Sequence, residues 1–476
     1  MIGRQERWQE DLFVAGPLSS LIPEDHILRR VNEVLDLSWL RDEVKELYCT
    51  GNGRPSIDPE AALRLMLAGF FQGIVHDRKL MREAQVNIAI RWFAGFRLDE
   101  KLPDHSSLTK IRQRWGVELF KKVFLRSIKT CIDADLVSGE TVHVDATLIR
   151  ADVSWESLTI QHTDTVIKEN SEDEDKPKGA GRPAKKPKAK KRSKTDPEAT
   201  MTTSSHSFRM EPCYKQHGAV DDLCGVIVDV DITTGEQSEG SQLPEQIGRI
   251  EANTRVKIDT LSADCGFAHG KNYELCEKKK IDAVIPPQKE NSKPKHIPLR
   301  RFKYDARNKI VKCPASKILT RRTENEQGWV YRANAKDCRK CPLRSRCIGE
   351  GRAARTVMIS NGYEALLRAR RRHARPDKKF KETLVRHRWK VEGMHGEAKT
   401  QHGLRRAVRR GLVNVAIQAY LTAIVINLKR LAAFAGSFVL RICSSPPIAC
   451  QSNALETTLK TELASPTRKE IFAQAA

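Results

Sequence analysis

The chain has 476 residues and a formal net charge of +24, from 84 lysines and arginines against 60 acidic residues. This length exceeds the roughly 100–200 residues of one domain, which excludes a single small module and predicts two or three structural units. Such a charge attracts polyanions over a range limited by salt screening, so we expect nucleic acid as the partner. A basic protein with merely solvated lysines and arginines remains the alternative.

The chain lacks the usual signals for export or membrane insertion. Its first residues, MIGRQERWQEDLF, carry charges where a signal peptide needs an apolar core, so we expect a cytoplasmic protein. The most apolar stretch, 412–428, contains four polar residues and is shorter than the ~20 apolar residues of a membrane span. It predicts a buried helix and no membrane partner. The twelve cysteines then indicate reduced thiols or metal ligands rather than disulfides.

The first part of the chain, up to about residue 132, is predicted to be helical. Residues 59–74 and 80–96 place apolar side chains at helical spacing. Residues 104–132 begin with plausible capping residues and mix apolar positions with basic ones, which predicts an amphipathic basic helix. This helix either contacts DNA or is an ordinary surface helix with arginines.

Strand patterns follow the helices. A β-branched run at 140–151 carries Asp145 in its middle, and 217–236 has the pattern of a hairpin. A third strand, 255–264, ends on Asp264. Helical spacing returns at 380–401, and residues from about 438 predict a loosely ordered tail.

A basic segment separates the first two of these strands. Residues 168–200 contain acids, lysines and prolines with almost no large apolar side chain, so they cannot bury enough surface to fold alone. Within them, 181-GRPAKK-186 is similar to the core of an AT-hook, in which Arg182 would enter a narrow minor groove. A plain basic linker is the alternative interpretation.

Three acidic residues suggest chemistry. A buried strand normally excludes carboxylates unless they are paired or bind a metal, so Asp145 and Asp264 need an explanation. Arg388, Glu392 and Lys399 are four and seven residues apart, which places them along one helical face. Three such carboxylates could hold two divalent cations that promote an in-line displacement at phosphorus. Capping aspartates and an ordinary helical ion pair remain the alternative.

These motifs resemble the DDE transposases of bacterial insertion sequences, over about residues 10 to 435. The family's first Asp lies in a strand similar to 142-VHVDATLIRA-151, and its second ends a strand similar to 262-SADCGF-267. Its Glu helix reads Tyr, two residues, Arg, three residues, Glu, six residues, Lys. The chain has the last three at these intervals, with Val385 in place of the Tyr. Any contact that depends on that tyrosine is therefore in doubt.

The resemblance implies a function and a set of residues. Asp145, Asp264 and Glu392 would be catalytic and would bind Mg²⁺ or Mn²⁺, while Arg388 and Lys399 would contact phosphates. The reaction would nick the element end and join the freed 3′-hydroxyl to target DNA, in a homodimer assembled on paired ends. A catalytically inactive, zinc-braced regulator and a plain metal-dependent nuclease are the rival functions.

Four cysteines form a second possible metal site. Cys338 and Cys341 have the spacing of a zinc knuckle, and Cys313 and Cys347 could complete a tetrahedral site. Four reduced thiols are the alternative. A zinc ion here would be structural rather than catalytic.

These predictions give an α/β fold, and the resemblance implies that its mixed sheet, flanked by helices, is ribonuclease-H-like. The expected parts are a helical DNA-binding domain at 1–132, a catalytic core at 138–300 and 356–437, a cysteine-containing insertion at 301–355, and the tail at 438–476.

Overall fold

The computed structural model describes residues 16–49, 56–154, 158–160, 191–193, 195–203, 210–289 and 294–443, with backbone only at 158–160, 191–192 and 436–443. The chain divides into two compact units, Met1–Ala433 and Phe434–Ala476. The second is described only as the end of the last helix. Arg182 lies outside the described residues, so the AT-hook stays a prediction.

The part before the sheet is helical in the described ranges 16–49 and 56–133. It contains α1 (Ile27–Val34), α2 (Leu40–Val44), α3 (Pro59–Phe71), α4 (Asp77–Val86), α5 (Ile88–Ala94), α6 (His105–Asp133), and the 3-10 turns η1 (Leu18–Leu21) and η2 (Lys45–Leu47).

Capping side chains set the bounds of these helices. The helix predicted over 59–74 is confirmed as α3, and the Asp58 carboxylate accepts two backbone N–H bonds of its first turn. The pattern over 80–96 forms two helices rather than one. Asn87 separates them, because its side chain accepts a bond from the Ile90 N–H at 3.1 Å and so starts α5.

Helix α6 confirms the long helix predicted over 104–132, with Asp104 as its N-cap. Gly116 adopts φ +69° inside it and kinks it. Arg112 is 3% exposed, so at least this arginine of the basic helix faces the interior rather than a DNA surface.

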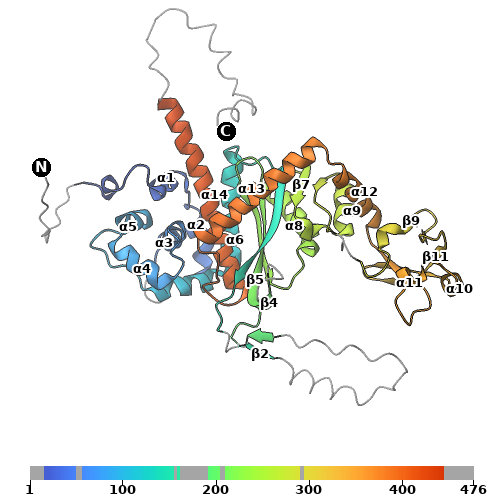
Figure 1. Ribbon diagram of the computed structural model, residues 1–476. Helices are drawn as coiled ribbons and strands as arrows, with labels where there is room; N and C mark the ends of the chain where they lie inside the picture. Colours follow the sequence, from blue (N-terminus) through green and yellow to red (C-terminus); the bar gives the residue numbers. More distant parts are fainter. Residues whose placement is uncertain are drawn as a thin grey trace, which may run out of the picture. The chain divides into compact units, whose positions relative to one another are not determined.

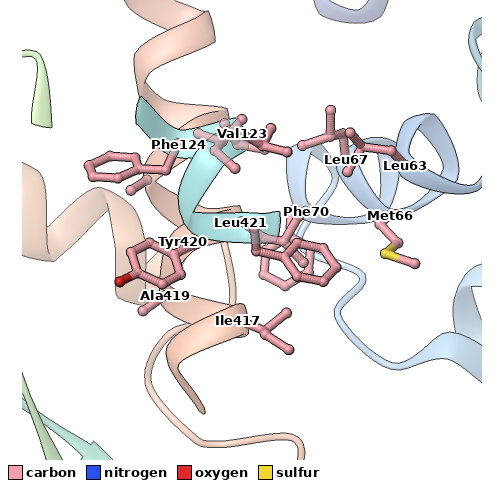
Figure 2. Close-up of a cluster of buried hydrophobic side chains, with 14 of the residues drawn as sticks. Leu63, Met66, Leu67, Phe70, Val123, Phe124, Ile417, Ala419, Tyr420 and Leu421 are labelled. Carbon is pink, nitrogen blue, oxygen red and sulfur yellow. The ribbon is translucent and has the colours of Figure 1, made fainter. Parts of the chain in front are cut away.

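The N-terminal helices share one hydrophobic core with the last helix, α14 (Leu412–Cys443). Figure 2 shows side chains of three helices meeting in this core, and the rings of Phe124 and Tyr420 lie 5.7 Å apart. The labelled residues are Leu63, Met66, Leu67 and Phe70 of α3, Val123 and Phe124 of α6, and Ile417, Ala419, Tyr420 and Leu421 of α14. By length and composition α14 could cross a membrane, but 72% of its apolar window is buried inside the protein.

The central sheet follows α6. Its strands are β1 (Thr141–Arg150), β2 (Leu158–Ile160), β3 (Lys191–Ser193), β4 (Thr200–Thr202), β5 (Glu211–Asp221), β6 (Ile227–Thr234), β7 (Thr260–Ala263) and β8 (Asp282–Val284). The predicted strand with Asp145 and the predicted hairpin are confirmed as β1 and β5–β6. The linker expected over 168–200 is wrong at residues 191–193, because they form β3, which pairs with β2 and β4 and extends the sheet.

The strand directions define a mixed sheet with the order β2-β3-β4-β5-β1-β7-β8, in which β6 also pairs with β5. Strand β5 pairs antiparallel with β1 and with β6, whereas β7 pairs parallel with β1 and with β8. The α/β class is therefore confirmed. The parallel pairing brings Val144, within β1, level with Ala263, the last residue of β7.

Further helices and 3-10 turns surround the sheet: α8 (Glu239–Thr254), η4 (Cys265–Phe267), α9 (Gly270–Lys279), α12 (Tyr363–Ala374) and α13 (Lys378–Thr400). Helix α13 confirms the helix predicted over 380–401. It contacts β1, β5, β7 and β8, and Figure 1 shows it crossing the sheet. Helix α8 contacts β6 and α6.

A second sheet has its own core, which includes Cys338 and Cys347 of two short helices beside the sheet. Its order is β13-β12-β11-β10-β9. The elements are η5 (Leu299–Arg301), β9 (Lys303–Asp305), β10 (Ile310–Lys312), β11 (Ile318–Asn325), β12 (Gly328–Ala333), α10 (Ala335–Arg339), α11 (Arg344–Cys347) and β13 (Thr356–Ser360). Because β13 pairs with β12, this sheet continues beyond residue 355, where the insertion was expected to end. The tail expected from 438 is likewise still helical to Cys443.

Candidate active site

A cavity of about 880 Å³ lies where β7 ends beside the middle of β1, and both Asp145 and Asp264 line it. The parallel register pairs Val144 with Ala263. The residues that follow, Asp145 and Asp264, therefore come at the same level of the sheet. Two of the three predicted carboxylates thus share one cavity.

Asp264 belongs to the turn that follows β7. Its Oδ1 accepts a hydrogen bond from the Gly266 N–H at 2.8 Å and so caps η4. Burial, together with the negative charges of Asp145 and Glu239, raises the pKa of Asp264 to about 6, although the hydrogen bond from Gly266 acts in the opposite direction. Carboxylates crowded in this way repel one another, so a bound cation would stabilise their charged forms.

A polar network holds α13 against β1. The His143 Nε2 lies 2.9 Å from the Asp222 Oδ1, and the Arg386 guanidinium lies 3.0 Å from the other oxygen of the same carboxylate. The His143 ring also packs against His387, with 5.5 Å between ring centroids. These contacts fix which face of α13 points at the cavity.

Of the predicted residues of α13, Lys399 faces the cavity, whereas Arg388 and Glu392 are exposed to solvent. Lys399 lines the cavity, but Glu392 does not. The Arg388 Nε donates to the Glu392 Oε1 at 2.9 Å, and these side chains are 77% and 66% exposed. The structure therefore does not bring Glu392 together with Asp145 and Asp264.

His395 is the α13 residue that faces Asp145. Its Nε2 lies 3.5 Å from the Asp145 Oδ2, and its side chain is 11% exposed. Among the described residues, neither ring nitrogen of His395 has a hydrogen-bond partner. The sequence placed this histidine one turn after Glu392, but its spacing alone gave no reason to prefer it over other histidines.

The cavity carries both signs of charge. Lys399 is largely buried, and burial lowers its pKa, as does the charge of Arg405, while Asp145 raises it. The charged residues that line the cavity are Asp145, Glu211, Glu239 and Asp264 with Arg150, Lys215, Lys399 and Arg405. Carboxylates suit divalent cations, and the lysines and arginines suit phosphate oxygens. The arrangement could therefore bind a cation together with a phosphodiester.

Several of these residues were not predicted from sequence. Glu239, Lys215 and Arg405 reach the cavity from α8, from β5 and from the segment after α13. No local spacing connects them with Asp145, because only the pairing of distant strands brings them together. An acidic residue at the start of a helix that follows a hairpin is too common to serve as a signal.

The four cysteines lie close enough to interact electrostatically. Burial raises the pKa of the Cys347 thiol, and the other three cysteines raise it further, against the effect of Arg355. The Cys313 Sγ accepts a bond from the Lys317 N–H at 3.3 Å. Nevertheless, within the part of the chain that the structure describes, no group of three or more His, Cys, Asp or Glu side chains is arranged so that it could hold a metal ion, either at the cysteines or in the cavity. The zinc site stays a prediction.

Comparison with known proteins gives two family matches. Residues 17–114 match a transposase domain, DUF772, and residues 312–432 match a transposase DDE domain. No curated protein matches the chain.

Two solved structures are similar to the chain at low identity. One is the piggyBac transposase synaptic complex with hairpin DNA, at 10% identity over 89% of this chain and 82% of that one, with a TM-score of 0.32. The other is the Mos1 transposase paired-end complex with the left transposon end, at 9% identity over 52% and 65%, with a TM-score of 0.16.

The chain therefore contains one region that matches a transposase domain and another that matches a transposase DDE domain. The DDE match contains Arg388, Glu392 and Lys399. Asp145 and Asp264 lie outside both matched ranges, so their assignment depends on the geometry of the cavity and on the resemblance of their strands.

Proposed function

We propose that the chain moves an insertion sequence by cutting phosphodiester bonds at the element's terminal inverted repeats and joining the freed 3′-hydroxyl to target DNA. The observation that carries the proposal is the shared cavity of Asp145 and Asp264, which also contains basic side chains. The DDE family match and the net charge of +24 support DNA as the substrate.

Asp145 and Asp264 would hold Mg²⁺ or Mn²⁺, because carboxylate oxygens are the ligands that hard divalent cations prefer. When bound, such ions activate the attacking oxygen and stabilise the leaving one. Lys399, Arg405 and Arg150 would bind the phosphates on either side of the cut and orient the strand. No side chain of the chain needs to act as a nucleophile.

Glu392 would join the site by changing its side-chain conformation. It lies three residues before His395, a rise of about 4.5 Å along the helix, and His395 contacts Asp145. An exposed ion pair such as Arg388–Glu392 is worth only a few tenths of a kcal/mol. A DNA phosphate that replaces Glu392 as the ion-pair partner of Arg388 would therefore release Glu392 at little energetic cost.

The finer architecture also belongs to this proposal. The strand order β6-β5-β1-β7-β8, with an antiparallel part followed by a parallel part, supports a ribonuclease-H-like catalytic layout. The transposase domain matched at 17–114 supports a DNA-binding role for the N-terminal helices. A homodimer on paired ends, a cytoplasmic location and a structural zinc ion on the four cysteines remain part of the same proposal.

One observation favours a second function. Because Glu392 is paired with Arg388 outside the cavity, the chain could be a regulator that binds DNA without cutting it. A regulator would not depend on the two aspartates. A plain nuclease would depend on them but would never join a 3′-hydroxyl to a target.

The test incubates the purified protein with Mg²⁺ and labelled element ends, and compares it with Asp145→Asn and with Glu245→Gln, an exposed acid on α8 outside the cavity. We expect the asparagine variant to lose strand cleavage by roughly a hundredfold or more while it still binds the ends, because charge stabilisation at the reacting centre is lost. The control should cleave and join like the original protein. Equal cleavage by both variants would remove the metal-site assignment, and cleavage without joined product would favour the nuclease.

A further inference from the structure

We propose that Glu239 is a further metal ligand of this site and supplies a carboxylate that Glu392 does not supply in the described arrangement. The inference rests on the proposed function, since it concerns the ions that transposition would use. It assigns a role to a residue outside the Asp145, Asp264 and Glu392 set.

The position of Glu239 is fixed by the fold. It is the first residue of α8, where the helix dipole stabilises a negative charge, and it lines the same cavity as Asp145 and Asp264. Its side chain is 26% exposed, against 66% for Glu392. In this conformation a carboxylate close to Asp264 therefore comes from α8 rather than from α13, whereas Glu211, the other glutamate of the cavity, is paired with Arg150 at 2.8 Å.

Gly266 shows how close the two carboxylates come. A Cβ built on Gly266 would lie 2.5 Å from the Glu239 Oε2 and 3.0 Å from the Asp264 Oδ1. Those two oxygens are therefore at most 5.5 Å apart, the sum of the two distances. Ligand oxygens of Mg²⁺ lie about 2.0–2.1 Å from the ion, so a small rotation of one side chain would let both bind it. Any side chain at position 266 would occupy that space.

The other oxygen of Glu239 is held by a cation. The Lys215 Nζ lies 3.2 Å from the Glu239 Oε1 and also donates to the Gln237 carbonyl at 2.8 Å. Lys215 thus orients the carboxylate and leaves the Oε2 directed toward Asp264.

An independent observation concerns a polar side chain beside Asp145. The His395 ring faces Asp145 with both nitrogens buried and, among the described residues, without hydrogen-bond partners. Buried polar atoms are rarely left in this state, so the His395 nitrogens could bind a water molecule in addition to the 3.5 Å contact of Nε2 with Asp145. A hydrated cation beside Asp145 would satisfy them.

The test measures Mn²⁺ binding to the full-length protein by electron paramagnetic resonance, without DNA and therefore without any dependence on activity. The variants are Glu239→Gln, which keeps the side chain's shape, Glu239→Asp, which keeps its charge, and the exposed control Glu245→Gln. We expect at least a tenfold loss of Mn²⁺ affinity in Glu239→Gln, a partial recovery in Glu239→Asp, and the original affinity in the control. Thermal unfolding of each metal-free variant verifies that it folds.

Asp145→Asn separates this inference from the proposed function. If Asp145→Asn abolishes Mn²⁺ binding and Glu239→Gln leaves it unchanged, the role of Glu239 is overturned and the proposed function stands. If the original protein binds no Mn²⁺, or if Asp145→Asn binds it normally, the metal site itself is overturned and the role of Glu239 falls with it.

Discussion

Glu397 is a residue whose charge links two long helices. It lies on α13, and its carboxylate accepts hydrogen bonds of 2.5 Å from both Lys429 and Arg430 of α14. His402 lies 3.6 Å away. Burial alone would raise the pKa of Glu397, but the bonds from His402 and Lys429 and the charge of Arg430 lower it to about 2.

This pKa predicts a defined pH dependence of stability. A carboxyl with a folded pKa of about 2 and an ordinary value of 4.5 stabilises the fold above pH 4.5 and loses that contribution as the pH falls toward 2. We expect Glu397→Gln to lower the free energy of unfolding by about 1–3 kcal/mol at pH 7, and the difference from the original protein to shrink below pH 4.5. Urea unfolding at several pH values measures it. A difference that grows on acidification would contradict the assignment.

At the scale of elements, a buried ion cluster joins three segments. Asp77 of α4 receives two hydrogen bonds from Arg112 of α6, at 2.6 and 2.7 Å, and one from Arg409, in the segment between α13 and α14, at 2.5 Å. The Asp77 and Arg112 side chains are 6% and 4% exposed. The cluster fixes the N-terminal helices to the C-terminal part of the chain.

Removing the acid of this cluster should be costly. Asp77→Asn leaves Arg112 and Arg409 as buried like charges, and losing one partner of a buried pair typically costs 3–5 kcal/mol. We expect a fall of about that size in the free energy of unfolding, measured by chemical denaturation. Glu382→Gln, which removes an exposed pair with Lys378, is the matched control and should change stability by less than about 0.5 kcal/mol. Similar effects of the two changes would mean that the cluster contributes little.

Elements with a strong local pattern could be predicted from the sequence, and elements defined by distant pairing could not. Helix α3 and strand β1 follow from apolar periodicity, which depends only on neighbours along the chain. The break at Asn87 depends on one side-chain bond, and β3 exists only through its pairing with β2 and β4. Propensity carries no information on such tertiary pairing.

The same distinction holds for the site. Asp145 and Asp264 could be named because each is an acid in or after an apolar strand and because their surroundings resemble a family motif. Glu239 and Lys215 could not be named, since they reach the cavity through the packing of α8 and β5. The side-chain conformation of Glu392 could not be predicted from the sequence either, because a motif gives the spacing of residues and not the direction of a side chain.

At the scale of the whole molecule, the net charge of +24 predicts DNA binding that depends strongly on salt. Each phosphate contact contributes about 0.9 to the slope of log affinity against log salt concentration. If Lys399 and Arg405 both contact phosphates, replacing both with glutamine should make the slope shallower by about 1.8. Fluorescence anisotropy with labelled element ends measures this.

The control for that measurement is Lys278→Gln, which removes an exposed charge paired with Glu274 on α9, outside the cavity. It should leave the slope within about 0.5 of the original value. If the double variant behaved like this control, the basic residues of the cavity would not contact DNA phosphates.

The shared core of α3, α6 and α14 also has a consequence for biosynthesis. The helices made first bury their apolar faces against a helix that begins only at Leu412, so a ribosome has translated most of the message before that core can close. Nascent or prematurely terminated chains would expose this apolar surface and would be substrates for chaperones and proteases. An element that carries a frameshift before α14 would therefore yield a polypeptide that is degraded, rather than a stable fragment that competes for the element's ends.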